Sequence, residues 1–100
     1  MNPQTVTLAG QDTRLKAPSM YAVIIHNDDI TTMDFVVEVL VQVFQKPVQE
    51  AAALMMDVHE KGQGVAGIYV FDIAATKKSQ ADQRSTERGF PLKLTIREVL

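Results

Sequence analysis

Cysteine is absent from this chain of 100 residues, and so is tryptophan. Without cysteine there is no disulfide framework, no thiolate metal site and no cysteine nucleophile, and the composition fits a reducing compartment. The net charge of -2 gives no basic excess of the kind that nucleic-acid binding usually requires. No apolar run approaches the roughly 20 residues that span a bilayer, and the N-terminal residues contain no signal-peptide core. These absences predict a soluble, cytoplasmic protein that binds neither nucleic acid nor membranes.

Catalytic signatures are also missing. No serine lies in a GxSxG elbow, no glycine-rich phosphate loop follows a predicted strand, and no HExxH zinc motif is present. Asp28, Asp29 and His59 include the donor types of a metal site, but their spacing matches no known signature. We therefore expect no metal, no cofactor and no catalytic residue. A metal-dependent hydrolase that uses these three side chains is kept as an alternative.

The hydrophobic pattern divides the chain into an arm and a domain. Residues 1–19 are polar and show no sustained period, which predicts a flexible N-terminal arm, whereas residues 20–100 form one patterned unit. Thr31 and Asp34 have the spacing of a capping box at the start of a helix. The apolar patterns predict strands at 21–26, 65–70 and 92–97, and helices at 31–45, 47–61 and 71–88. The order β-α-α-β-α-β predicts an α+β fold: a single compact domain whose three-stranded antiparallel sheet carries three helices on one face.

A polar cluster stands where the first predicted strand meets the first helix. It consists of Asn27, Asp28 and Asp29, residue types that favour turns for purely structural reasons. On the second predicted helix, Met55 and His59 are four residues apart and therefore share a face. A lone histidine beside an apolar stripe is more often structural, and methionine more often fills a core, although its flexible thioether also suits an adaptable pocket. From the residue types alone, both the structural and the binding interpretation stay open.

Several motifs in sequence order resemble one known family. The signature N-D-D-[aromatic]-T-P-M-[acidic]-F-V is similar to NDDITTMDFV at 27–36, and the resemblance continues at 53–62, 65–69, 74–77 and 90–92. It covers roughly residues 20–100 without gaps. On these motifs the chain resembles ClpS, the adaptor of the Clp AAA+ protease and a recognin of the N-end rule. Ile30 and Thr32 depart from the signature where the family has an aromatic residue and a proline, and Ala75 replaces a common glutamate.

The resemblance implies a non-enzymatic adaptor. ClpS proteins bind the free N-terminal residue of substrates that begin with Leu, Phe, Tyr or Trp, and they deliver these substrates to a ClpA-like AAA+ unfoldase and its protease. It also implies a monomer whose N-terminal arm engages the unfoldase.

The resemblance further implies roles for individual residues. The substrate's α-amino group is surrounded by Asn27, Asp28, Asp29 and His59. The side chain of the substrate's first residue enters a hydrophobic pocket formed by Thr31 at the mouth and by Met33, Val36, Met55, Val58 and Leu92. Docking to the unfoldase is carried by Asp72 and Lys77.

The chemistry of these residues suits an ammonium group. An α-amino group has a pKa of about 7.7–8.0 and is therefore largely cationic near neutrality. Its three donors match amide, carboxylate and imidazole acceptors, whereas an internal residue offers one N–H and no charge. Burial of one large apolar side chain adds about 1.5–3 kcal/mol, so selective binding requires both halves of the site. A regulator that docks the unfoldase without recognising an N-terminus is the remaining alternative.

Overall fold

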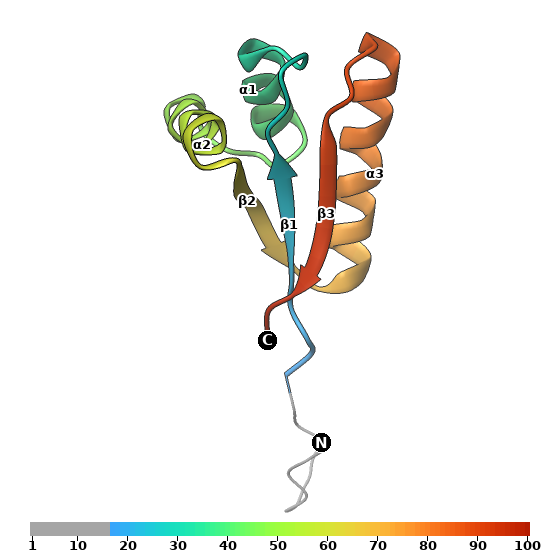
Figure 1. Cartoon of the computed structure of the whole chain (residues 1–100). Coiled ribbons are helices and arrows are strands. Elements are labelled where there is room, and N and C mark those ends of the chain that lie inside the picture. The colour runs from blue at the N-terminus through green and yellow to red at the C-terminus, as the bar shows by residue number, and fades with distance from the viewer. Residues whose placement is uncertain (1–16) are drawn as a thin grey trace, which may run out of the picture.

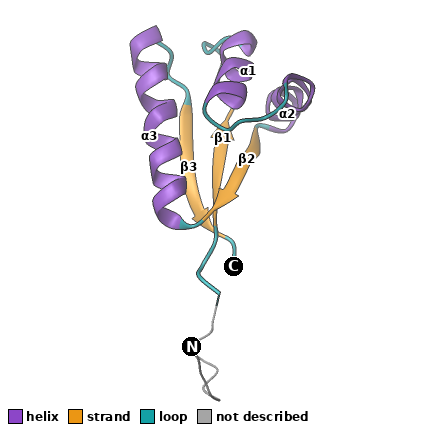
Figure 2. Cartoon of the chain, turned by 180° about the vertical axis from the view of Figure 1, so that it is seen from behind, coloured by secondary structure: helices purple, strands orange, loops and turns teal. Residues whose placement is uncertain are grey.

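The computed structural model describes residues 17–100, which form the predicted α+β fold. The strands are β1 (Tyr21–His26), β2 (Gln63–Tyr69) and β3 (Lys93–Glu98), and the helices are α1 (Met33–Gln42), α2 (Val48–Lys61) and α3 (Phe71–Arg88). The antiparallel sheet has the order β2-β1-β3, with β1 in the centre. All the labelled helices lie on one face of this sheet, and α3 runs alongside β3 (Figures 1 and 2). Fold class and element order are therefore as predicted, while the predicted arm, residues 1–19, lies mostly outside the described residues.

The central strand supplies part of the core. Val23 and Ile25 of β1 are fully buried and belong to the cluster that packs beneath the helices. The pairing of β1 with β2 shifts register between Val23 and Ile24, which face Gly67 and Val65 and leave Ala66 as the additional residue of a bulge. A bulge of this kind bends the strand that carries the additional residue.

Two glycines of β2 allow close approach of other groups. A Cβ atom built on Gly64 would lie 2.9 Å from Val58 Cγ2, so the absence of a side chain lets α2 pack directly on this strand. At Gly67 the same atom would overlap the Tyr69 side chain, which lies over the glycine. The contact at Gly64 positions α2, the helix that carries His59.

The start of α1 differs from the prediction by one residue. The N-cap is Thr32, whose hydroxyl oxygen accepts a hydrogen bond from the Phe35 backbone N–H at 3.1 Å. The predicted capping box of Thr31 and Asp34 is therefore wrong, because the Thr31 hydroxyl is bonded to Asp28 instead. The helix also ends at Gln42, three residues earlier than predicted.

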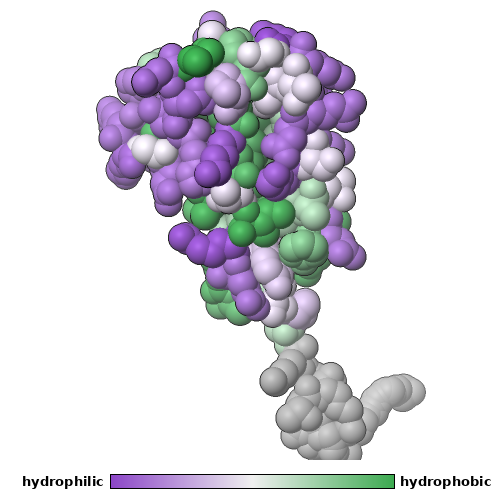
Figure 3. All heavy atoms as spheres, turned by 45° about the vertical axis from the view of Figure 1, so that its right-hand side comes forward, coloured by the Kyte–Doolittle hydropathy of each residue, from purple (hydrophilic) through white to green (hydrophobic). Residues whose placement is uncertain are grey.

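Helix α3 has the predicted bounds and ends at Gly89, whose φ of 75° suits a glycine C-cap. It packs against the sheet through the small residues Ala74, Ala81 and Ser85, and the Ser85 hydroxyl donates to the Ala81 carbonyl at 2.8 Å. Ile73 of the same helix is 46% exposed. Figure 3 shows apolar surface bordered by hydrophilic side chains on the side where β3 and α3 come forward.

Across residues 17–100, no helix combines the length and the hydrophobicity needed to cross a membrane.

Candidate functional site

A pocket lies at the end of the sheet where β1 runs into the β1–α1 loop. Its volume of about 370 Å³ falls within the range of small-molecule sites. The wall is built from three neighbouring elements: the loop after β1, the first turn of α1 and the C-terminal half of α2. It is lined by Asn27, Asp28, Asp29, Ile30, Thr31, Thr32, Met33, Val36, Met55, Val58 and His59. All the residues predicted to surround an amine therefore lie together here, and so do all but one of those predicted to form the apolar pocket.

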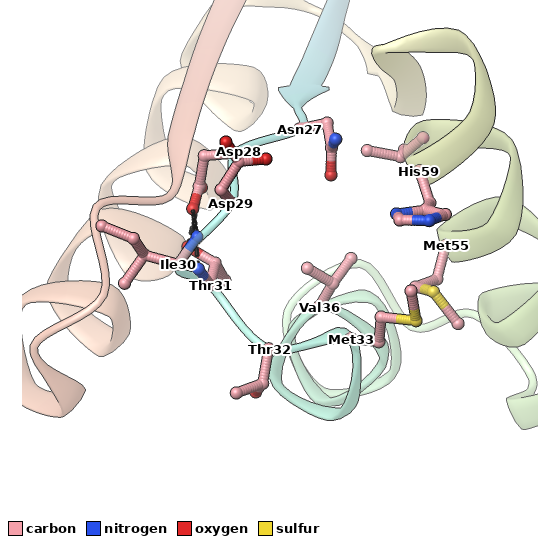
Figure 4. A pocket seen from close by; sticks show the side chains of 11 residues that line it. Asn27, Asp28, Asp29, Ile30, Thr31, Thr32, Met33, Val36, Met55 and His59 are labelled. Carbon is pink, nitrogen blue, oxygen red and sulfur yellow. Dashed lines mark hydrogen bonds between the residues drawn. The ribbon is translucent and has the colours of Figure 1, made fainter.

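The polar side of the pocket joins the loop to the end of α2. The Asn27 backbone N–H donates to the Gly62 carbonyl at 2.9 Å. Gly62, with a φ of 93°, is the C-cap of α2, and its own N–H bonds to Val58. This connection holds Asn27 near the last turn of α2, and Figure 4 shows the Asn27 amide and the His59 imidazole on the same side of the opening. Both side chains are exposed, so their polar atoms are available to a ligand.

The Asp28 carboxylate organises the loop. Its Oδ1 accepts hydrogen bonds from the backbone N–H groups of Ile30, at 2.8 Å, and Thr31, at 2.6 Å, while Oδ2 accepts from the Thr31 hydroxyl at 2.7 Å. In Figure 4 this carboxylate is turned toward its own loop. Asp29 makes no comparable bond among the described residues. Asp28 therefore positions the loop, and Asp29 is the carboxylate left with free acceptors.

The hydrogen bonds of Asp28 also determine its ionisation. Burial raises the pKa of this carboxyl, but the bonds from Thr31 and Ile30 outweigh that effect and lower the pKa below its ordinary value of 3.8. Because the folded pKa is depressed, the stabilisation is complete above pH 3.8 and disappears as the pH falls through the lower folded value. The loop therefore keeps its shape throughout the neutral range.

Replacing Asp28 should loosen this loop. The Asp28→Ala variant leaves the two N–H groups without their carboxylate, and we expect a loss of about 1 kcal/mol in unfolding free energy at pH 7. Titration of the Thr31 amide resonance by NMR should show an inflection below pH 3.8 in the natural chain. In an Asp28→Asn variant, which has no carboxyl group at this position, the same resonance should show no such inflection. An inflection that survives this change would contradict the assignment.

The opposite side of the pocket is apolar. Val36 and Val58 form its base and are 7% and 2% exposed. Met55 is half-buried, and Met33 is 42% exposed at the start of α1. Met55, Val58 and His59 follow the i, i+3, i+4 spacing of one helix face, so α2 presents the imidazole next to the apolar wall.

Leu92 does not line this pocket. It precedes β3, is 7% exposed and belongs to the hydrophobic core beneath the helices. Val36 and Val58 belong to the same core and also line the pocket, so the predicted contact of Leu92 with a bound side chain stays a prediction. Ile30 and Thr32, the two departures from the family signature in this loop, also line the pocket. The signal for them was present, because both lie between Asp29 and Met33 in a single short loop.

The two residues predicted to dock the unfoldase have different surroundings on α3. Asp72 lies in the first turn and is exposed. Lys77 is half-buried, and its ammonium donates to the Val43 carbonyl at 2.8 Å and to Gln45 Oε1 at 2.6 Å. It also lies 5.6 Å from the Tyr69 ring centroid. Lys77 therefore ties α3 to the end of α1, a role that the sequence did not reveal.

In residues 17–100, no group of three His, Cys, Asp or Glu side chains is arranged to hold a metal ion. The metal-dependent hydrolase considered for Asp28, Asp29 and His59 thus finds no ligand set in this region.

Comparison with known proteins gives a consistent assignment. Residues 16–95 match the family model described as "ATP-dependent Clp protease adaptor protein ClpS". The ClpS of Clostridium acetobutylicum is 48% identical over 89% of this chain and 88% of its own length, and that of Acetivibrio thermocellus is 47% identical over 92% and 93%. The solved structure of Agrobacterium tumefaciens ClpS2 bound to L-phenylalaninamide superposes with a TM-score of 0.80 at 36% identity, covering 83% of this chain and 100% of that one. The chain therefore belongs to the ClpS family of adaptors of the ATP-dependent Clp protease.

Proposed function

We propose that this chain binds the free N-terminal residue of proteins that begin with a bulky hydrophobic residue (Leu, Phe, Tyr or Trp), and delivers them to a ClpA-like AAA+ unfoldase. The observation that carries the proposal is a single pocket with a polar side and an apolar side. A chain terminus of this kind presents both a charged amine and a large apolar side chain. Each half of the pocket matches one of these groups.

The amine is assigned to Asn27, Asp29 and His59. Their side chains offer an amide oxygen, a carboxylate and an imidazole nitrogen, which suit the three donors of an ammonium group. All hydrogen bonds from an ammonium are charge-assisted, and Asp29 adds an opposite charge to its bond, so Asp29 contributes most to selection for a free terminus. Asp28 acts alongside them by holding the loop in place and by adding a second negative charge.

The first side chain is assigned to the apolar wall of Met33, Val36, Met55 and Val58, with Thr31 at the mouth. The relative from Agrobacterium tumefaciens supports this assignment, since its ligand, L-phenylalaninamide, carries a free α-amino group and a benzyl side chain. Flexible methionine side chains let one pocket accept both aliphatic and aromatic residues.

Docking to the unfoldase is assigned to Asp72, with Lys77 beside it on α3. Two of the three ammonium hydrogens of Lys77 are donated to the Val43 carbonyl and to Gln45 Oε1, so one hydrogen remains for a partner. In this proposal the adaptor acts in the cytoplasm as a monomer and catalyses no reaction, because its task is to present a chain end to the protease. The N-terminal arm remains part of the predicted unfoldase contact.

A peptide series that differs only in its first residue tests the proposal. Peptides that begin with Leu or Phe should bind about 10- to 150-fold more tightly than one that begins with Ala, as expected from burying a large apolar side chain. Fluorescence anisotropy of labelled peptides measures this ratio. An Asp72→Ala variant is the matched control, since it lies away from the pocket and should give the same ratio. Equal affinities throughout the series would instead favour the regulator that docks the unfoldase without reading an N-terminus.

A further inference from the structure

Sulfur in this sequence is confined to methionine, because the chain contains five methionines and no cysteine. Met33 of α1 and Met55 of α2 both line the pocket, so two separate helices bring a thioether to it. Figure 4 shows both sulfur atoms (yellow) on the side of the pocket opposite the loop that carries Asp28. The apolar half of the pocket therefore contains two oxidisable groups.

We propose that Met33 and Met55 form an oxidation-sensitive site, at which peroxide converts the thioethers to sulfoxides and thereby weakens binding of a hydrophobic N-terminal residue. This inference rests on the proposed function, because it requires the first side chain of the substrate to lie against these methionines. It adds a reversible control to substrate binding.

The reaction is a two-electron oxidation of sulfur. A lone pair of the thioether sulfur attacks one oxygen of hydrogen peroxide, a new S–O bond forms, and the O–O bond breaks. The other oxygen leaves as hydroxide and takes the proton of the transferred hydroxyl group, so the products are one sulfoxide and one water. Methionine sulfoxide reductases reverse the change with two electrons from a thiol reductant, and the oxygen then leaves as water.

Solvent exposure determines whether peroxide reaches the sulfur atoms. Met33 is 42% exposed at the start of α1, and Met55 is half-buried. Val36 and Val58 are almost completely buried, so the two methionines form the outer layer of the apolar wall. Because susceptibility follows exposure, we expect Met33 to be oxidised before Met55.

A sulfoxide changes the surface that the first side chain meets. The thioether is apolar and flexible, whereas the sulfoxide is polar. A Leu or Phe side chain packed on this wall would displace water from the sulfoxide oxygen without offering it a hydrogen bond, which is unfavourable. The polar side of the pocket, with Asn27, Asp29 and His59, contains no sulfur and should keep its affinity for the amine.

Peptides that begin with Phe or Ala, titrated into the chain before and after peroxide treatment, test this consequence. Complete oxidation should weaken binding of the Phe peptide about 10-fold, and that of the Ala peptide less than about 2-fold, because Ala buries little surface on the wall. Fluorescence anisotropy gives the affinities, and mass spectrometry of proteolytic fragments gives the extent of oxidation at each methionine. Equal losses for the two peptides, or no loss for either, would overturn the inference.

Leucine substitutions test which methionines are responsible, because leucine has no sulfur and a similar volume. In a Met33→Leu/Met55→Leu double variant, peroxide should no longer change the affinity for the Phe peptide, compared with the same variant before treatment. Met56→Leu is the matched control, since Met56 is also 42% exposed but lies outside the pocket on α2. This control should show the full loss, and a loss that persists in the double variant would remove Met33 and Met55 from the role.

Protection by a bound peptide tests the site without any substitution. At a Phe-peptide concentration about 10 times the Kd, roughly one tenth of the chain is free, so oxidation of Met33 and Met55 should slow by up to about 10-fold. Met56 in the same sample should react at an unchanged rate and serves as the internal reference. Equal rates for Met33 and Met55 with and without peptide would contradict their position at the ligand.

The untreated chain separates this inference from the proposed function. Equal affinities for the Phe and Ala peptides before oxidation would refute recognition of a hydrophobic first residue. A preference for Phe that survives complete oxidation of Met33 and Met55 would refute the oxidation-sensitive site alone.

Discussion

Acetylating the α-amino group of a peptide that begins with Leu should weaken its binding at least about 100-fold. Acetylation removes the positive charge and leaves one N–H donor where the ammonium had three. A hydrogen bond to a charged group contributes about 1.5–3 kcal/mol, and two such losses correspond to more than a 100-fold change in affinity. Isothermal titration calorimetry at pH 7 with the free and acetylated peptides measures the difference. Equal affinities would mean that the pocket reads the side chain alone.

His59 offers a complementary change on the protein. The His59→Ala variant should bind the free peptide about 10-fold less tightly, whereas its affinity for the acetylated peptide should hardly change. The difference between the two losses of affinity is a coupling free energy between His59 and the amine, and it identifies the amine as the group that His59 contacts. Glu60→Ala is the matched control, since Glu60 is the next residue of α2, is exposed and does not line the pocket. A loss of equal size for both peptides in His59→Ala would point to a general disturbance of α2.

In the proposed function, the two halves of the pocket explain why recognition would require a chain end. An internal segment could place a large side chain on Val36 and Val58, but it would bring a neutral amide to Asn27 and Asp29. The polar groups would then lose their water without gaining a charged partner, which costs free energy. A terminus with a small first residue would satisfy the polar side and leave the apolar base exposed to water.

Local patterns were sufficient to predict most of the fold. The run at 21–26 is β1 to the residue, and the helix between Phe71 and Gly89 ends at the predicted glycine. The N-cap of α1 could not be assigned in this way, because Thr31 and Thr32 are equally good caps by type. Competition decides between them: Asp28 takes the Thr31 hydroxyl, so Thr32 is left to cap the helix.

Long-range contacts mark the limit of prediction at the site. The loop motif brought Asn27, Asp29 and Met33 together because they are close in sequence, and helical spacing did the same for Met55 and His59. Leu92 was assigned to the pocket only through the family resemblance, and the structure places it in the core but not in the pocket lining. The bond from Lys77 to Val43, 34 residues away, has no local signal and depends on how α3 packs beside α1.

Replacing Phe35 should cause the largest loss of stability considered for this chain. Phe35 is 1% exposed, its ring centroid lies 4.9 Å from that of Phe90, and the Arg88 guanidinium lies 5.1 Å from its ring. It therefore joins α1 to the segment that follows α3. Burial of a phenylalanine in such a core predicts that Phe35→Ala lowers the free energy of unfolding by about 3–5 kcal/mol. Domains of this size are stable by only about 5–15 kcal/mol, so much of the total would be lost.

Thermal unfolding followed by circular dichroism distinguishes this core effect from the loss of any aromatic ring. At about 4–8 °C per kcal/mol, Phe35→Ala should lower the Tm by at least 12 °C. Phe71→Ala is the matched control: Phe71 is 50% exposed and makes an edge contact with Tyr21, with ring centroids 5.1 Å apart. That contact contributes about 1 kcal/mol, so the control should lose only a few degrees. Similar shifts for the two variants would show that the core does not depend on Phe35, and that another contact holds α1, with Met33 and Val36, against the sheet.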